Sequence, residues 1–354
     1  LRRVEAGRSV AVEDILATMP DLVNQVQSEG SLWAPEIAAV AIKQACGSIE
    51  EAVFLMRAYR STLERLYTSR VVDTDGMRAG RRISAAFKDI EGGQILGATR
   101  DYSHRLIEFE LADETVSDAR ERAREIRSRL SAPADADAAA LLDRVPRVLT
   151  YLRSIDMVRD WPVDDTEPVD ITKTPLSFPA PRSVILQALS RGLTQAVVAI
   201  GYAAIRGFGL SHPTVGELRR GTVAIEIDAL GASEDAAEDA YYLGSIPVTE
   251  VESLIVSDEE DGDGGHRSAL DVGYGLVMGD DESKAIAMSV LDHSLRADDV
   301  RFPTQDQEFV LYHIDGVEAT GFISHLKLPH YVTFQSKLDS ALRSAAEKGG
   351  EADA

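Results

Sequence analysis

The segment at residues 47–66, GSIEEAVFLMRAYRSTLERL, has the pattern of a capped amphipathic helix, and it restricts the fold of this chain more than any other segment. Ser48 and Glu51 have the spacing of a capping box, which marks the start of a helix. Apolar residues then recur at three- and four-residue steps, as they do on one face of an α-helix. The pattern predicts helices within residues 11–70 and one buried apolar stripe, formed by Ala52, Val53, Met56, Tyr59, Leu63 and Leu66.

The second half of the chain adds strands to these helices. The alternation VAIEID at residues 223–228 predicts a strand with one buried face. Helices are predicted at 183–205 and 333–346, and a further apolar strand is predicted at 309–315. We therefore expect an α+β fold, in which a helical N-terminal region precedes a mixed α/β portion with antiparallel strands.

A length of 354 residues exceeds the usual size of one hydrophobic core, so several regions are expected. We predict a mainly helical region with a basic, glycine-punctuated loop at 1–110, a variable insertion or linker at 111–170, and an α+β region at 171–354. In the last region, the glycines of GYGLVMG at 273–279 predict a turn before a helix. The acids at 280–282 favour structural capping of that helix over phosphate binding.

The charge of the chain limits its partners. A formal net charge of -22 repels phosphate backbones and anionic lipids, so we expect neither nucleic acid nor a membrane as partner. No apolar run approaches the ~20 residues of a membrane span, and no signal peptide opens the sequence, so we expect a cytoplasmic protein. The acidity is concentrated between residues 228 and 266, which contain twelve Asp or Glu. A local basic pocket elsewhere is therefore compatible with the net charge.

Residues 77–105 are such a basic segment, with six Lys or Arg against three acids. One interpretation is a solvated helix face followed by a loop. The other is an anion pocket, in which arginines and loop amides hold phosphate oxygens.

Two of the seven histidines, His325 and His330, flank Pro329 within GFISHLKLPHYVTF. Residues five apart do not share a face of a helix or of a strand, but a bend at the proline could aim both rings at one point. A zinc site needs at least three protein ligands, so a second segment, another subunit, substrate or water must complete any metal site here. Zinc suits imidazole ligands, and the spacing leaves other divalent ions open.

Several long segments, taken in order, resemble the PhnI family, the I subunit of the bacterial carbon-phosphorus lyase system. The resemblance spans roughly residues 22–340 and departs from the family at 115–145. The short strand with which members usually open is expected to be missing before Leu1. The segments that carry the resemblance are AIKQACGSIEEAVFLMRAYRSTLERL, MRAGRRISAAFKDIEGGQILGATRDYSHRL, DITKTP, GFGLSHPTVGELRRG, GYGLVMG and QDQEFVLYHIDGVEATGFISHLKLPHY.

The resemblance implies a reaction on ATP. With subunits G, H and L, such proteins replace the adenine of ATP with an alkylphosphonate at the ribose anomeric carbon, giving ribose 1-methylphosphonate 5-triphosphate. Alone, they release purine from nucleoside triphosphates. The resemblance also implies a core assembly with two copies each of G, H, I and J. In it, His325 and His330 match paired histidines of a metal site that faces the J subunit.

Cleavage of an N-glycosidic bond needs negative charge near the ribose and a proton for the departing base. The candidate carboxylates are Asp101, Glu217, Asp306 and Glu308. The triphosphate needs cations and Mg²⁺. The candidate contacts are Arg81, Arg82, Lys88 and Lys327.

Two other functions stay open. The chain could be a non-catalytic scaffold that positions the J subunit and its metal site. It could also be an independent nucleoside hydrolase, which would be fully active without partners.

Overall fold

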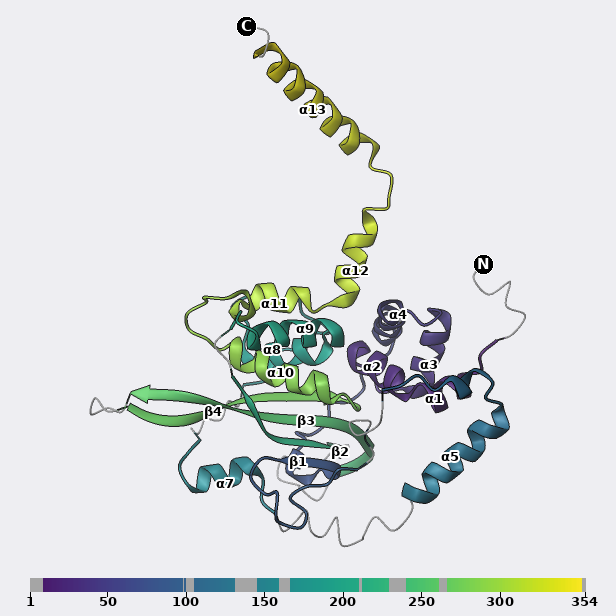
Figure 1. Cartoon of the computed structure of the whole chain (residues 1–354), viewed down its shortest axis with the longest axis vertical. Helices are drawn as coiled ribbons and strands as arrows, with labels where there is room; N and C mark the ends of the chain where they lie inside the picture. The colour runs from purple at the N-terminus through teal and green to yellow at the C-terminus, as the bar shows by residue number, and fades with distance from the viewer. Residues whose placement is uncertain are drawn as a thin grey trace.

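The structure, a computed structural model, describes residues 9–97, 99, 105–130, 145–158, 166–209, 212–228, 240–260 and 266–351. Within these residues, four strands form one antiparallel sheet in the order β1-β2-β3-β4, and helices cover one of its faces (Figure 1). The predicted α+β fold is confirmed. The strands are β1 (Arg78–Ser84), β2 (Thr214–Asp228), β3 (Ala240–Glu260) and β4 (His266–Met278).

A bundle of helices forms the N-terminal part, as predicted: α1 (Val12–Thr18), α2 (Pro20–Gly30), α3 (Pro35–Gln44) and α4 (Ile49–Ser61). Ser48 caps α4, because its Oγ accepts a hydrogen bond from the Glu51 amide at 3.5 Å. Ala52, Val53 and Met56 lie in the core of this bundle. The predicted stripe is only half correct: Tyr59 lies in α4 but is exposed, and Leu63 and Leu66 follow the end of α4 at Ser61 and are exposed too.

Helices cover one face of the sheet: α10 (Glu282–Ser294) and α8 (Arg182–Arg191) pack on the strands, and α9 (Thr194–Ile205) and α11 (Gln307–His313) pack against these two helices. The helix predicted at 183–205 is thus two helices, which separate at Gly192. Helix α10 lies directly on β4, because a Cβ at Gly273 or Gly275 would lie 2.0 Å from a carbonyl oxygen of α10. These two glycines therefore belong to a strand rather than to the predicted turn. Asp281 caps α10 as predicted, by accepting from the Lys284 amide at 3.0 Å.

The strand predicted at 309–315 is wrong, because these residues belong to α11 and the turn after it. Val310, Leu311 and Ile314 are buried together, and their spacing is that of one helix face. Asp306 caps this helix by accepting from the Phe309 amide at 2.9 Å.

The opposite face of the sheet is covered by shorter elements, η1 (Thr74–Gly76) and α7 (Val148–Ser154). Strand β1 lies in the basic segment, for which a helix face or loop was predicted, and it pairs with β2. The sheet thus joins residues from the first and third predicted regions. The three-region division itself stays a prediction.

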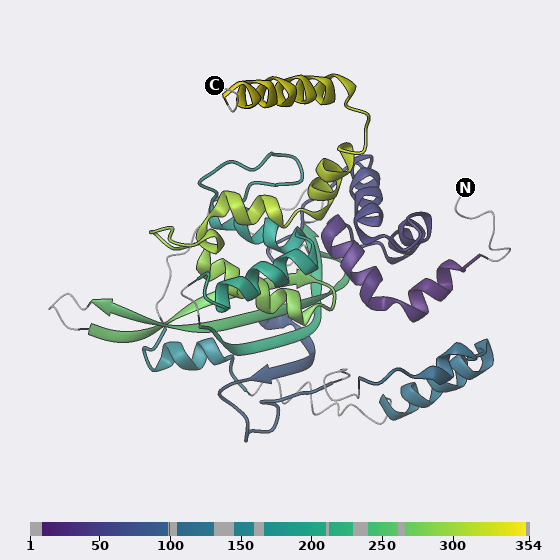
Figure 2. The ribbon, with the colours of Figure 1, turned by 45° about the horizontal axis from the view of Figure 1, so that its top comes forward.

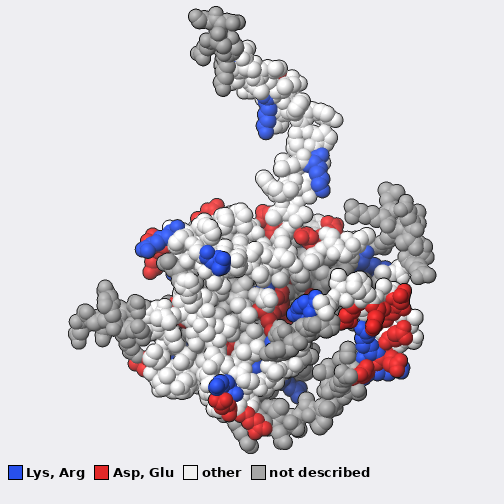
Figure 3. All heavy atoms as spheres, viewed as in Figure 1, with Lys and Arg blue, Asp and Glu red and all other residues white. Residues whose placement is uncertain are grey.

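Two C-terminal helices, α12 (Gly316–His325) and α13 (Tyr331–Glu351), project from the body in both views (Figures 1 and 2). The closing helix predicted at 333–346 is part of α13. Both helices expose large apolar side chains and carry few charges on the face seen in Figure 3. Their exposed apolar residues include Phe322, Ile323, Leu326, Tyr331, Val332, Phe334 and Leu342.

The described part of the predicted insertion at 111–170 begins within η2 (Phe109–Ala112) and includes α5 (Val116–Leu130) and α7; charged side chains gather around α5 in Figure 3. η3 (Pro303–Gln305) precedes α11. Among the described helices, none combines the length and apolarity needed to cross a membrane.

Candidate functional site

A cluster of charged side chains is buried on the face of the sheet that lies opposite the layer of α8–α11. Alternate residues of a strand point to the same face, so Glu217 and Arg219 of β2 share this face. Glu250 and Glu252 of β3 lie directly opposite Arg219 and Glu217. Arg82 of β1 lies opposite Arg219 and joins them. We call these five residues the sheet cluster.

Ion pairs connect the sheet cluster. Arg82 Nε lies 2.8 Å from Glu217 Oε1, and both side chains are almost fully buried. Arg219 Nη2 lies 2.6 Å from Glu250 Oε2. Buried charges are stable only when they are paired, so each of these groups depends on its partner.

Arg147, which precedes α7, lies over the charged face of the sheet and contacts the cluster. Its Nη2 lies 3.0 Å from Glu250 Oε2 and also contacts Glu252 Oε1, while its Nη1 lies 2.8 Å from Asp75. The next residue, Val148, donates its backbone N–H to Glu217 Oε2 at 2.9 Å. The start of α7 therefore holds the carboxylates of both central strands.

Burial and the neighbouring arginines together give the two β3 carboxyls different pKa values. It raises the pKa of Glu252 to about 7, although Arg147 opposes the shift. Burial acts on Glu250 too, but Arg147 and Arg219 outweigh it and hold the pKa of Glu250 below its usual value. The buried Tyr274 hydroxyl donates to Glu250 Oε1 at 2.9 Å, and burial raises its pKa. Glu252 can therefore exchange a proton near neutral pH, while Glu250 stays ionised.

A cavity of about 300 Å³ adjoins this cluster, between the sheet and the residues before α7. Its charged lining comes from Asp75, Arg82, Arg147, Glu217 and Arg219. This volume is at the lower end of small-molecule sites, and it fits a sugar-sized part of a substrate.

The adjacent arginines of the basic segment lie on opposite faces of β1, as neighbours on a strand must. Arg81 Nε lies 2.6 Å from Glu282 Oε1 of α10, on the helix-covered face. Arg82 lies on the other face and lines the cavity. Lys88 is exposed, and its Nζ lies 3.9 Å from Asp89. The structure therefore does not bring the three predicted phosphate contacts of this segment together.

The two histidines lie close together at the junction of α12 and α13. Their ring centroids are 5.6 Å apart and the rings are nearly perpendicular. His325 Nδ1 contacts the Phe322 carbonyl, and His330 Nε2 lies 3.3 Å from the His325 carbonyl. If these nitrogens carry the protons, His325 Nε2 and His330 Nδ1 keep lone pairs for a metal.

Both rings are exposed, so their free nitrogens are accessible to a partner. In the part of the chain that the structure describes, no group of three or more His, Cys, Asp or Glu could hold a metal ion. The pair fits two positions of a zinc site, and the remaining ligands would come from outside these residues.

The other predicted site residues lie apart from the sheet cluster. Asp306 caps α11, so this carboxylate has a structural role. Glu308 is exposed in the first turn of that helix, and Lys327 is exposed between the histidines. Asp101 lies outside the described residues.

Sequence reasoning selected Arg82 as a phosphate contact and Glu217 as a catalytic carboxylate, and it missed the partners that surround them. A signal was present, because Glu250 and Glu252 flank one apolar residue, and so do Glu217 and Arg219. Two strands that each repeat charge with period two predict one charged face. Arg147 carried no such signal, since it comes from a distant segment.

The chain is similar to known proteins of phosphonate metabolism. A family model described as bacterial phosphonate metabolism protein (PhnI) matches residues 1–348. A putative C-P lyase subunit protein HtxH of Stutzerimonas stutzeri is 41% identical over 346 residues, which cover 97% of this chain and 89% of the relative.

Two further relatives are each named alpha-D-ribose 1-methylphosphonate 5-triphosphate synthase subunit PhnI. That of Escherichia coli (strain K12) is 40% identical over 332 residues, covering 92% of this chain and 87% of the relative. That of Rhizobium meliloti (strain 1021) is 38% identical over 354 residues, covering 97% and 90%. The chain belongs to the PhnI family of bacterial phosphonate metabolism proteins.

Proposed function

We propose that this chain is the PhnI subunit of an alpha-D-ribose 1-methylphosphonate 5-triphosphate synthase within a carbon-phosphorus lyase system. The observation that carries the proposal is the similarity to two relatives of that name, at 38% and 40% identity over nearly the whole chain. The proposed substrates are ATP, with Mg²⁺ on its phosphates, and an alkylphosphonate. The proposed place of action is the cytoplasm.

The proposed reaction is a ribosyl transfer at the N-glycosidic bond of ATP. The bond between the ribose anomeric carbon and the purine nitrogen breaks, and a phosphonate oxygen forms the new bond to that carbon. The purine leaves with the bonding electrons and takes up a proton. When water replaces the phosphonate, the same step is a nucleosidase reaction.

We assign the chemistry to the sheet cluster. Glu217 lines the cavity, where its carboxylate would stabilise positive charge on the ribose ring. Glu252 does not line the cavity itself, but it lies directly opposite Glu217 and contacts Arg147, both of which do, and its pKa of about 7 suits the group that supplies a proton for the departing base. A carboxylate beside the ribose and a proton donor for the departing base are what acid-assisted glycosidic cleavage requires.

Cationic contacts to the phosphates belong to the same proposal. Arg82 lines the cavity, and we place it nearest the reacting groups. Arg81, Lys88 and Lys327 lie outside this cavity, and their role as phosphate contacts stays a prediction.

We further propose that His325 and His330 hold a zinc ion at a subunit interface. The exposed rings and the apolar surface of α12 and α13 support this, because both are suited to contact with another chain. The proposed partners are subunits G, H, J and L, in a core that contains two copies of this chain. When bound, the metal would fix the position of α12 and α13 against the partner.

Release of free adenine tests the enzymatic proposal. ATP is incubated with the purified chain, alone and with its partner subunits, and adenine is measured by HPLC. We expect release by wild type and by the Glu36→Gln control, at an exposed position of α3, and at least a ~100-fold slower rate for Glu252→Gln. Equal rates for the two variants would reject the assignment of Glu252.

A non-catalytic scaffold is the second candidate. The projecting α12 and α13, with their exposed apolar residues, favour it. It predicts that the chain alone releases no adenine and that Glu252→Gln leaves release by the complete complex unchanged, while removal of α13 abolishes assembly with the partner subunits.

A further inference from the structure

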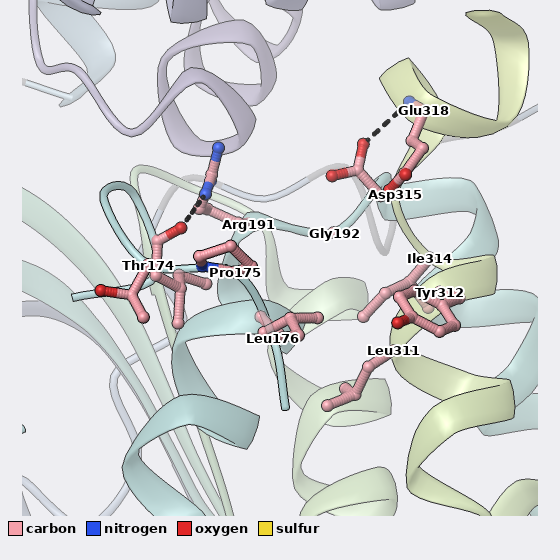
Figure 4. A pocket seen from close by; sticks show the side chains of 12 residues that line it. Thr174, Pro175, Leu176, Arg191, Gly192, Leu311, Tyr312, Ile314, Asp315 and Glu318 are labelled. Atoms are coloured by element: carbon pink, nitrogen blue, oxygen red, sulfur yellow. Dashed lines mark hydrogen bonds between the residues drawn. The ribbon is translucent and has the colours of Figure 1, made fainter. Parts of the chain in front are cut away.

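A second cavity, of about 330 Å³, lies on the other side of the molecule from the charged face of the sheet, between the loop at 171–176, the end of α8 and the start of α12. Arg191, the last residue of α8, lines it together with Thr174 and Tyr312. Figure 4 shows Arg191 on one side of this cavity, with Asp315 and Glu318 of the α12 start on the other. The loop belongs to the segment DITKTP, to which the proposed chemistry assigns no role.

Arginines from three places gather beside this cavity. Arg57 Nη1 lies 2.9 Å from Asp315, and Arg65 Nη1 contacts Asp170. These two cations are therefore neutralised. Arg57 also donates to the Arg191 carbonyl at 3.3 Å, which places the end of α4 against the end of α8.

Arg191 and Arg60 lack such partners among the described residues. Arg191 Nη1 donates to the Ile171 carbonyl at 3.4 Å, a long hydrogen bond, and its buried Nε has no acceptor. Arg60 lies one helical turn after Arg57, and its buried Nε has no acceptor either. A partly buried guanidinium with unused donors is costly unless an anion approaches it.

The lowered pKa values of Arg191 and Arg60 are consistent with too little negative charge around them. Burial, together with Arg57 and Arg60, lowers the pKa of Arg191 to about 10, although Asp315 and Asp170 partly oppose the shift. Burial and the nearby Arg65 likewise lower the pKa of Arg60. Both arginines would be stabilised by an added anion.

We propose that this cavity binds a tetrahedral phosphate or phosphonate dianion, with Arg191 as its direct contact and Arg60 as a neighbouring cation. Guanidinium groups bind such oxyanions through paired N–H donors. Glu318 lines the cavity and is exposed, so its carboxylate weakens the attraction. The site is separate from the sheet cluster, and the inference does not depend on the ribosyl-transfer proposal.

Isothermal titration calorimetry on the full chain tests the site, with pyrophosphate and methylphosphonate as separate probes at low ionic strength. We expect wild type to bind at least one probe, and Arg191→Gln to bind it at least ~10-fold more weakly, which is about 1.4 kcal/mol. Arg60→Gln should weaken binding by a smaller factor. Arg206→Gln is the matched control, because Arg206 is an exposed arginine at the end of α9. It should bind as wild type does.

Glu318→Gln separates a binding role from a structural one, because removal of a like charge should tighten binding while loss of a structural contact should not. If wild type binds pyrophosphate more tightly than methylphosphonate, the site is assigned to a polyphosphate chain. If it binds methylphosphonate more tightly than pyrophosphate, the site is assigned to the phosphonate. The inference is overturned if wild type binds neither probe, or if Arg206→Gln weakens binding as much as Arg191→Gln does. This test measures binding and not adenine release. Its result therefore does not depend on whether the sheet cluster is catalytic.

Discussion

Arg82 and Glu217 form an ion pair across neighbouring strands, with Nε and Oε1 2.8 Å apart and side chains that are 2% and 1% exposed. They are diagonal neighbours, because Arg82 lies opposite Arg219, two residues along β2 from Glu217. Arg82 also donates to the carbonyls of Val145 and Pro146, at 3.2 and 2.9 Å. The pair therefore connects β1, β2 and the segment before α7, and it forms one wall of the candidate site.

Replacement of Glu217 by alanine should lower the free energy of unfolding by about 3–5 kcal/mol, because it leaves the buried Arg82 cation without a carboxylate. The double variant Arg82→Met, Glu217→Leu should recover most of this loss, since it removes both charges and keeps the volume. Urea denaturation followed by circular dichroism measures both. Lys88→Ala, at an exposed residue, is the control and should change stability little. A double variant as unstable as the single one would contradict this account.

The carboxyl of Glu252 should make stability fall as pH rises. Burial raises its pKa from 4.5 in the unfolded chain to about 7 in the fold, so between these values the native state binds more protons than the unfolded state. The free energy of unfolding should decrease by on the order of 3 kcal/mol between pH 4.5 and 7 from this group, and then stay level.

Glu252→Gln should lose this component, because glutamine resembles the protonated carboxyl and does not titrate. Denaturation curves at pH 5, 6, 7 and 8 for wild type and variant give the difference directly. Glu308→Gln, at an exposed position of α11, serves as control and should follow wild type. Parallel curves for wild type and Glu252→Gln would show that the carboxyl is ionised throughout.

The histidine pair gives a prediction about metal content. His325→Ala should remove the bound metal from the complex purified with its partner subunits, because the chain would keep only one of its two imidazole ligands. Elemental analysis by mass spectrometry measures metal per complex. His313→Ala removes an exposed histidine at the end of α11 and should leave the metal in place. Equal metal in all three samples would exclude the pair as ligands.

Local signals in the sequence predicted the helix starts, and long-range partners were not predictable from it. Ser48 and Asp281 cap helices as expected, because a cap depends on residues three positions away. The apolar run at 309–315 was misread as a strand, since a short run does not distinguish a strand from one buried helix face. The basic segment could be recognised from the sequence, but the partners of its arginines could not. Strand register and helix packing decide that Arg81 pairs with Glu282 and Arg82 with Glu217.

The histidine spacing illustrates the same limit. The sequence indicates that a bend at Pro329 could bring the rings together, and their centroids lie 5.6 Å apart. That expectation depended on the local chain alone. The identity of further ligands depends on other segments or chains, so the metal stays a proposal.

The contact of α10 with β4 predicts which glycine is essential. A methyl group at Gly275 would lie 2.0 Å from the Ala285 carbonyl oxygen, so Gly275→Ala must push the helix off the strand. We expect a loss of at least ~3 kcal/mol in the free energy of unfolding, because backbone cannot move aside as a side chain can. The helix carries Asp281 and Glu282, so the Arg81–Glu282 pair should be disturbed as well. Gly76→Ala is the matched control, because a Cβ there meets no atom within 4 Å, and it should be close to neutral. Thermal and urea unfolding of both variants decide the matter: equal stabilities would mean that α10 does not rest on β4 at this glycine.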